Sequence, residues 1–286
     1  DLAGSGLHEL ERVSRMSWLR PSCPNRRLAP ILAGLGLAVA AMFCGVKPSL
    51  AGWRPEPSRR FDIQLMAPYD LARPADVVAL PLFDTPPVRL QELRSRGVAA
   101  VCYVMAGAWE SWRPDAGQFP QPVVGRRIEG RADQRWLDIR QASLRPVLER
   151  RIELCGDRGF DGVLFAGLDG YTRDSGFDLT AEQQLAFNRW LAEIAHARGL
   201  AAGIVNDLDQ AAELTNAFEF LVADACLEQG NCAAIQPFLA AHKPVFLLAY
   251  TNVPRRMNEH CAVAKKIGGT LIFKTRYLNG ELHRRC

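Results

Sequence analysis

Residues 201–250 decide the fold, and they read AAGIVNDLDQAAELTNAFEFLVADACLEQGNCAAIQPFLAAHKPVFLLAY. Three short apolar runs occur within this stretch, at residues 201–205, 218–223 and 244–250, and longer amphipathic segments separate them. Continuous apolar runs of this length are typical of strands that are buried on both faces, as in a parallel sheet. The stretch therefore predicts strands that alternate with helices.

The same alternation continues on both sides of this stretch. Five more apolar runs lie at residues 61–66, 77–83, 99–106, 162–168 and 269–274. Residues 144–158 carry apolar side chains at helical spacing, and Thr180 with Gln183 forms the capping-box pattern of a helix that ends before Gly199. Eight strands that alternate with helices predict a single α/β domain, a (β/α)₈ TIM barrel.

A doubly wound open sheet is the alternative α/β fold. Such a sheet would normally bring a glycine-rich phosphate loop after its first strand, and the sequence has no such motif. The length of 286 residues is compatible with one barrel, because TIM barrels typically need about 250 residues.

The first 51 residues differ in composition from the rest of the chain. Residues 28–46 are almost wholly apolar, arginines precede them, and Ser49 and Ala51 provide small residues before Gly52. This is the layout of a secretory signal peptide with its cleavage site. We therefore expect an upstream segment and signal peptide at 1–51, a barrel domain at 52–286, and a secreted or periplasmic protein. The alternative is an uncleaved membrane anchor, because about 19 apolar residues can span a bilayer.

Charge excludes one class of partner. Without residues 1–51, the chain keeps 29 basic residues against 28 acidic ones. A near-neutral domain lacks the basic surface that binding to nucleic acid requires. We expect no nucleic-acid partner, and we expect the protein to act as a monomer.

Six cysteines follow the expected cleavage site, and export would place them where disulfides persist. Cys226 and Cys232 flank a Gly-Asn turn and are the expected bridge, while Cys261 and Cys286 could tie the C-terminal tail to the last helix. Cys102 and Cys155 lie in apolar segments, and we expect them to be buried free thiols. Because no Cys or His spacing matches a metal-ligand motif, we expect neither a metal site nor a cofactor.

Polar and aromatic side chains follow the predicted strands. Active sites of TIM barrels lie on the loops at these strand ends. The candidate residues are Gln64, Asp84, Tyr103, Glu110, Asp169, Tyr171, Asn206, Asp224 and Tyr250, together with Trp112, Arg113, Asp115 and Trp136 from the long insertion at 109–136. Planar side chains cover the apolar faces of sugars and short polar groups bind their hydroxyls, so this set predicts a carbohydrate site.

Individual members of this set have structural alternatives. An aspartate at a strand end, such as Asp84, Asp138 or Asp207, can instead cap the following helix. Arg113 and Asp115 can pair with each other and fix the long insertion.

Longer motifs add a family resemblance. They are LFDT at 82–85, WRPDA at 112–116, WLDIR at 136–140, GFDGV at 159–163, DGY at 169–171 and AHARGL at 195–200. In order and spacing over residues 60–286, these motifs resemble glycoside hydrolase family 114, the endo-α-1,4-polygalactosaminidases. The resemblance implies a TIM barrel that acts on α-1,4-linked galactosamine polymers with two carboxylates.

The chain departs from the family pattern at polar positions of the barrel. Where the family carries aspartates, a serine, a lysine and a glutamate, this chain has Ala79, Pro81, Met105, Ala166, Val205 and Ala249. The resemblance implies one catalytic carboxylate at position 166, which is alanine, and the other at Asp224, where the family has glutamate. Asp169 is the nearest carboxylate that could replace the missing one.

Two functions are compatible with these departures. The first is a carbohydrate-binding protein for an amino-sugar polysaccharide whose hydrolysis is lost or strongly impaired, since glycoside hydrolysis needs a pair of carboxyl groups. The second is an active glycosidase with the rearranged pair Asp169 and Asp224.

Overall fold

The computed structural model describes residues 53–57 and 59–286. The expected signal segment at 1–51 and its cleavage site lie outside the described residues. In the part of the chain that is described, no helix has the length and apolar character needed to cross a membrane.

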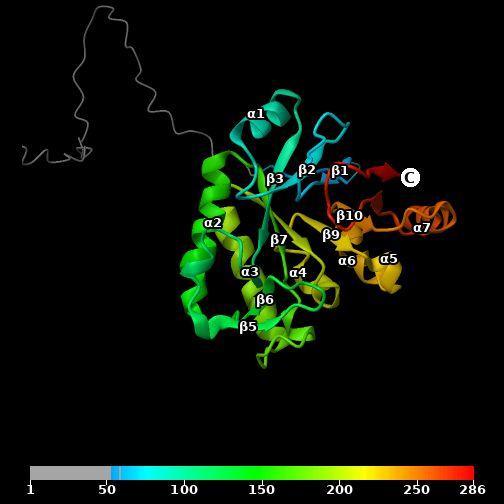
Figure 1. The fold of residues 1–286 in the computed structure, drawn as a ribbon. Coiled ribbons are helices and arrows are strands. Elements are labelled where there is room, and N and C mark those ends of the chain that lie inside the picture. The colour runs from blue at the N-terminus through cyan, green and yellow to red at the C-terminus, as the bar shows by residue number, and fades with distance from the viewer. Residues whose placement is uncertain (1–52, 58) are drawn as a thin grey trace, which may run out of the picture. The chain divides into compact units, whose positions relative to one another are not determined.

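Among the described residues, nine strands form one curled sheet (Figure 1). In spatial order they are β1 (Phe61–Ile63), β2 (Val77–Pro81), β3 (Ala99–Met105), β7 (Gly162–Ala166), β8 (Ala201–Val205), β9 (Phe220–Asp224), β10 (Val245–Ala249), β11 (Thr270–Phe273) and β12 (Arg284–Arg285). The first eight pair in parallel, and β12 pairs antiparallel to β11. The eight predicted strands are thus confirmed, and their arrangement fits a TIM barrel rather than a doubly wound sheet.

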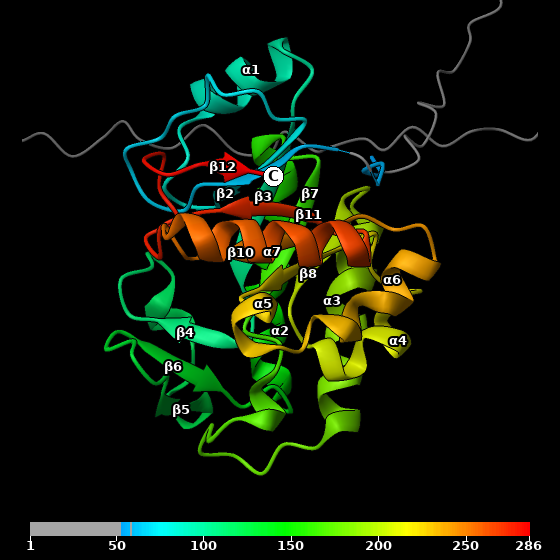
Figure 2. The same ribbon diagram turned by 90° about the vertical axis from the view of Figure 1, so that its right-hand side faces the viewer.

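From β2 onward, helices connect the parallel strands and cover the outside of the sheet. They are α1 (Pro87–Ser95), α2 (Arg145–Arg158), α3 (Ala181–Ala197), α4 (Ala211–Leu214), α5 (Cys226–Gln229), α6 (Gln236–Ala240) and α7 (Pro254–Ile267). The predicted capping box is present, because Thr180 Oγ1 accepts from the Gln183 backbone N–H and Gln183 Oε1 accepts from that of Thr180. In Figure 2, α7 lies across β10 and β11, whereas α2 and α3 cover the region of β7 and β8.

The long insertion after β3 forms a small sheet of its own. Its strands β4 (Ala108–Glu110), β6 (Gln134–Leu137) and β5 (Val124–Arg127) pair antiparallel in that order. Figures 1 and 2 both show this sheet beyond the carboxyl ends of the barrel strands. The insertion therefore builds one wall over the face of the barrel where active sites occur.

Alternate residues of each barrel strand fill two separate apolar cores. Side chains such as Phe61, Ala79 and Phe246 fill the inside of the sheet, and the rings of the two phenylalanines stack with centroids 4.5 Å apart. The intervening residues, among them Val78 and Leu80, pack against the helices. A strand that is buried on both faces explains why the predicted strands are continuous apolar runs rather than alternating ones.

Three disulfides link the described cysteines. Cys226–Cys232 and Cys261–Cys286 are both formed, as expected. Cys102 and Cys155 are buried but bonded to each other, so the prediction of free thiols there is wrong. The two residues are 53 positions apart, and only the packing of α2 on β3 brings their Cα atoms to 5.9 Å.

Candidate functional site

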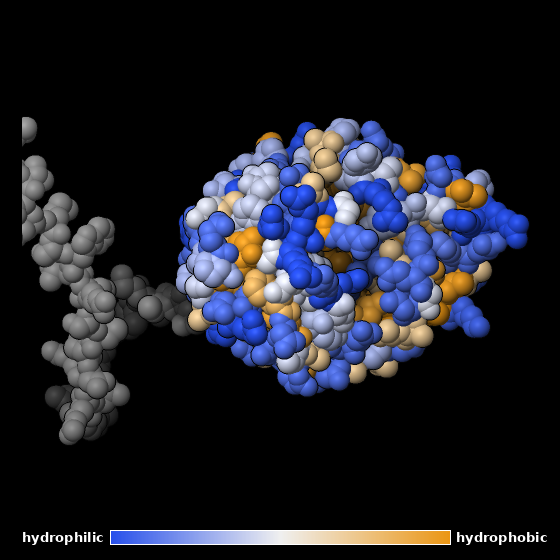
Figure 3. Space-filling view, turned by 60° about the horizontal axis from the view of Figure 1, so that its bottom comes forward, coloured by the Kyte–Doolittle hydropathy of each residue, from blue (hydrophilic) through white to orange (hydrophobic). Residues whose placement is uncertain are grey.

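A groove with two lobes crosses the carboxyl ends of the barrel strands. The first lobe, of about 690 Å³, lies between the insertion and the ends of β7, β8 and β9. The second lobe, of about 670 Å³, lies between the β1–β2 loop, Trp112 and the segment at 276–278. The lobes meet at shared lining residues, which are Tyr103, Met105, Arg131, Gln134 and Asp224. Figure 3 shows a hollow on this face, with hydrophobic colour at its bottom and hydrophilic groups at its rim.

The floor of the first lobe is apolar. Met105, Ala108 and Ala166 form a cluster against which Ile128 and Val205 pack. A close backbone contact shapes this floor, because a Cβ on residue 107 would lie 1.7 Å from the carbonyl oxygen of residue 167, and both positions are glycine. Position 166, where the family resemblance implies a catalytic carboxylate, thus presents only a methyl group.

Asp224 ends β9 in the centre of the groove. Its backbone N–H donates to Asn206 Oδ1 at 2.8 Å, which holds the ends of β8 and β9 together. Burial raises the pKa of the Asp224 carboxyl group above its ordinary value, although Tyr250 and the guanidinium groups of Arg131 and Arg276 oppose that shift. A carboxyl group with a raised pKa is suited to act as a general acid.

Asp169, the other candidate carboxylate, is engaged elsewhere. Its Oδ2 atom accepts hydrogen bonds from Arg173 Nε at 3.0 Å and Nη2 at 2.5 Å. Asp169 and Asp224 line the same lobe, so the structure brings both to one pocket. A carboxylate that is already paired with a guanidinium is a poor nucleophile, because the cation stabilises its charge.

The second lobe is built around Arg113. Its guanidinium group donates to Glu110 Oε2 at 2.8 Å and to Asp84 Oδ2 at 2.7 Å, and it lies 5.6 Å from the centre of the Trp112 ring. The two carboxylates hold the guanidinium in place beneath Trp112, which remains 52% exposed. The lobe therefore offers an aromatic ring on a supported loop, and such a surface suits the apolar face of a sugar.

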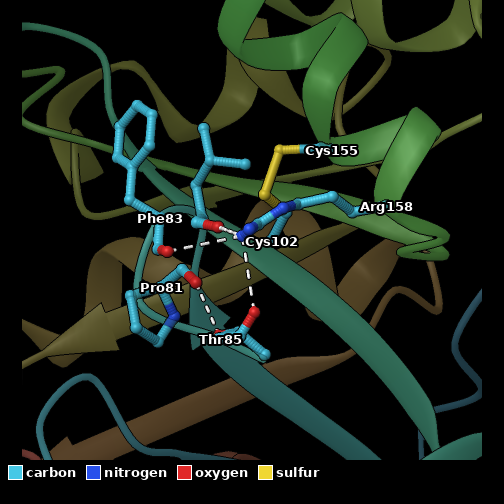
Figure 4. Close-up of a disulfide and its surroundings, with 7 residues drawn as sticks. Pro81, Phe83, Thr85, Cys102, Cys155 and Arg158 are labelled. Carbon is cyan, nitrogen blue, oxygen red and sulfur yellow. Dashed lines mark hydrogen bonds between the residues drawn. A yellow bond between two sulfur atoms is a disulfide. The ribbon is translucent and has the colours of Figure 1, made fainter. Parts of the chain in front are cut away.

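Arg158 fixes the loop that carries Asp84. The Arg158 guanidinium group donates to the backbone carbonyl of Leu82 and approaches those of Phe83 and Thr85, next to the Cys102–Cys155 disulfide (Figure 4). The Thr85 hydroxyl donates to the Pro81 carbonyl at 2.6 Å. Asp84 consequently faces Arg113.

The three aspartates that could have capped a following helix make other contacts instead. Helix α1 has Pro86 at its N-cap, so Asp84 does not cap it. Asp138 binds the Arg140 guanidinium group at 2.7 Å, and Asp207 makes no side-chain capping bond to the short helix that follows it. The alternative pairing of Arg113 with Asp115 is also wrong, since Asp115 binds Arg151 at 2.7 Å.

Most of the predicted site residues line the groove. Asp224 and Tyr103 line both lobes, Asp169, Trp136 and Asn206 line the first, and Asp84, Glu110, Trp112, Arg113 and Tyr250 line the second. Gln64, Asp115 and Tyr171 line neither lobe. Gln64 is fully buried and binds Asp62 and the backbone of Asp70. Because β1 ends before Gln64, its amide lies in the seam of the barrel, the place where the first and last parallel strands meet.

Several residues of the groove lie outside the set predicted from the sequence. Arg131, Gln134 and Arg276 line the shared part or the second lobe, and Met66 and Tyr277 form its exposed apolar rim. Arg276 lies 4.8 Å from the centre of the Tyr250 ring. Arg131 and Arg276 lie in irregular segments and Gln134 begins the short strand β6, so none of them belongs to a longer periodic pattern, and the turn residue Gly130 before Arg131 is the one local signal. Within the described residues, no group of three or more His, Cys, Asp or Glu side chains is placed to hold a metal ion.

Comparisons with known proteins agree with this geometry. The family model described as Glycoside-hydrolase family GH114 matches residues 46–286, which confirms the resemblance seen in the motifs. The crystal structure of Aspergillus fumigatus Ega3 in complex with galactosamine is 28% identical, covers 82% of this chain and 98% of its own, and has a TM-score of 0.79. No curated protein gave a match.

Two more distant structures share the fold. The glycoside hydrolase domain of PelA from Pseudomonas aeruginosa is 17% identical with a TM-score of 0.59, over 79% of this chain and 97% of its own. Amy13B from Eubacterium rectale is 6% identical with a TM-score of 0.52, over 79% of this chain and 67% of its own.

Proposed function

The chain belongs to Glycoside-hydrolase family GH114, and from that membership we propose that it binds a galactosamine-containing polysaccharide in its groove with little or no hydrolysis. The substrate class comes from the family and from the galactosamine in the Ega3 complex. The loss of turnover comes from residues of this chain.

One observation carries the proposed loss of hydrolysis. The pocket that contains Asp224 has a methyl group at position 166, on an apolar floor with Met105 and Val205. Cleavage of a glycosidic bond needs one carboxyl group to protonate the leaving oxygen and a second to act as nucleophile or as base for water. Asp169 could supply the second group only by leaving Arg173.

The elements that suit binding are present. The two lobes give the groove room for more than one sugar unit, and Tyr103 and Trp112 offer aromatic surface within it. Binding requires stacking surfaces and hydrogen-bonding groups, whereas turnover additionally requires groups that stabilise the transition state. The substitutions in the barrel remove the second kind and leave the first.

We expect the purified protein to bind an α-1,4-linked galactosamine polymer and to release almost no new reducing ends. The Ala166→Asp and Asp224→Glu substitutions together should raise the rate of reducing-end release. Each single variant should remain nearly inactive, because either carboxyl group alone lacks its partner. A reducing-end assay on all four proteins, with binding measured in parallel, tests this.

The active glycosidase with the pair Asp169 and Asp224 is the competing function, since both residues line the first lobe. Turnover by the unaltered protein at an ordinary enzyme rate, on the order of 1 s⁻¹ or faster, would establish it and overturn the proposed loss. In that case Asp169→Asn should abolish the activity, while Asp174→Asn, at the exposed rim of the same lobe, should not.

We also propose that the protein acts outside the cytosol, as the apolar segment at 28–46 predicts. The three disulfides support this location, because such bonds form and persist in oxidising compartments. N-terminal sequencing of the secreted protein should begin at Gly52 or within a few residues of it. Recovery only from membranes, with residues 28–46 retained, would instead establish the anchored form.

A further inference from the structure

The first lobe combines an apolar floor with a polar rim. Met105, Ala166, Val205 and Ile128 all line it, and Met105 and Ala166 are 9% and 3% exposed. Hydroxyl groups of a sugar gain nothing from such a floor, because burying a hydroxyl without a hydrogen-bond partner is unfavourable. A floor of methyl and thioether groups instead favours a ligand that brings a methyl group of its own.

A buried amide beside this floor has an unused acceptor. Gln134 is 5% exposed, and its Nε2 lies 3.4 Å from Glu110 Oε1. Since an ionised carboxylate only accepts hydrogen bonds, the amide nitrogen must face Glu110, and Oε1 lies on the other side. Within residues 53–57 and 59–286, no donor reaches Gln134 Oε1. The oxygen is enclosed as the side chain stands, and a small rotation of the amide toward the lobe would let the N–H group of a ligand satisfy it.

Donors for a carbonyl oxygen are also present at this place. Arg131 lines both lobes and makes no ion pair with any other described residue. Asn206 uses its Oδ1 atom to accept from the Asp224 backbone, so its amino group is left to donate into the lobe. The lobe thus contains a floor for a methyl group, an acceptor for N–H and donors for C=O.

A free ammonium group has less to bind at this position. Burial raises the pKa of the Asp224 carboxyl group, so at a given pH this group carries less negative charge than an ordinary aspartate and attracts an ammonium group less. Glu110 is occupied by Arg113. The carboxylate that would attract an ammonium group at position 166 is replaced by a methyl group.

We propose that the first lobe is a subsite for the acetamido group of an N-acetylated hexosamine. This inference rests on the proposed binding of an amino-sugar polysaccharide in the groove and specifies which form of the polymer is bound. The methyl group contacts Met105 and Ala166, the N–H donates to Gln134 Oε1, and the carbonyl oxygen accepts from Arg131. The groove therefore prefers N-acetylated stretches over stretches with free amino groups.

A matched pair of ligands tests this preference. An α-1,4-linked galactosamine oligomer is titrated into the protein by calorimetry before and after chemical N-acetylation, so that only the acetyl groups differ. We expect the acetylated oligomer to bind about tenfold more tightly, as one buried methyl group and one added hydrogen bond suggest. Equal affinity, or tighter binding of the free-amine oligomer, would overturn the subsite but leave the proposed function standing. Failure of both oligomers to bind would overturn the proposed function and the subsite together.

Variants locate the preference in this lobe. Ala166→Asp should reverse it, because a carboxylate then replaces the methyl floor and attracts an ammonium group. The matched control is Ala241→Asp, the same change at an exposed position outside the groove, which should keep the wild-type preference. Gln134→Leu should weaken binding of the acetylated oligomer severalfold and so bring the two affinities closer together. A preference that survives both Ala166→Asp and Gln134→Leu would place the acetamido group elsewhere.

Discussion

Asp207 shows how a single residue in this barrel responds to its surroundings. It follows β8 with a φ of 51°, is 3% exposed, and accepts a hydrogen bond from Asn188 at 2.7 Å. Burial raises the pKa of its carboxyl group to about 7, and the nearby charges of Asp169 and Asp209 add to that shift. The folded protein therefore holds a proton on Asp207 that the unfolded chain has already lost near pH 4.

This difference predicts a dependence of stability on pH. Because the folded state binds more protons than the unfolded state between about pH 4 and pH 7, Asp207 lowers the free energy of unfolding as the pH rises through that range. The slope from this group approaches about 1.4 kcal/mol per pH unit. Asp207→Asn should flatten the profile and stabilise the protein at pH 8, since asparagine tolerates a positive φ and cannot ionise.

Urea denaturation at a series of pH values measures this effect. Asp157→Asn, at an exposed position on α2, is the control and should leave the profile unchanged. If Asp207→Asn kept the wild-type slope, another group would have to be responsible for it.

Between elements, the disulfides differ in how much chain they enclose. Cys102–Cys155 joins β3 to α2 across a separation of 53 residues, whereas Cys226–Cys232 closes a loop with a separation of 6 within the α5 region. A bridge restricts the unfolded chain more when it closes a longer loop. The first bridge therefore contributes more to stability than the second.

We expect paired substitutions to alanine to separate the two bridges. Loss of Cys102–Cys155 should lower the free energy of unfolding by about 4 kcal/mol and loss of Cys226–Cys232 by about 2 kcal/mol. Guanidinium denaturation of both double variants gives the comparison, and equal losses would contradict the loop-length argument. Because Arg158 on α2 holds the loop of Asp84, the first variant should also weaken oligomer binding in the second lobe.

At the scale of the whole barrel, a buried ion pair links the first parallel strand to the end of the last one. Asp62 in β1 and Lys274 after β11 form an ion pair of 2.9 Å, and both side chains are almost completely buried. His283, from the segment that leads into β12, lies 3.0 Å from the same carboxylate. Burial alone would raise the pKa of Asp62, but its contacts with His283 and with the Lys274 ammonium group outweigh burial and lower the pKa to about 2.

Breaking this network should destabilise the entire fold. Asp62→Asn leaves the Lys274 ammonium group buried without a counter-charge, and we expect a loss of about 3–5 kcal/mol in the free energy of unfolding at pH 7. Since the folded pKa lies below the unfolded one, the wild-type contribution is present above about pH 4 and is lost as the pH falls toward 2.

Asp76→Asn is the matched control for this change, measured by urea denaturation in the same way. It breaks the pair with Arg60, whose side chain is 50% exposed, and exposed pairs contribute at most about 1 kcal/mol. Comparable losses in the two variants would show that the seam of the barrel does not depend on Asp62.

Local sequence patterns are enough to predict the strands, the helices α2 and α3, and the family. Strands buried on both faces must be continuous apolar runs, and the box at Thr180 satisfies backbone groups within one turn, so both features are local and readable. The absence of a carboxylate at position 166 is likewise evident from the sequence, because alanine stands where the family carries a carboxylate.

Which side chains share the groove depends on tertiary packing. Gln64 was expected there, but its amide belongs to the seam, whereas Arg131, Gln134 and Arg276 were not expected and line the groove. Cys102 and Cys155 likewise pair because α2 packs on β3. The physical reason is that such contacts join residues far apart in the chain, and the direction of each side chain depends on where an irregular loop crosses the barrel, which no local pattern encodes.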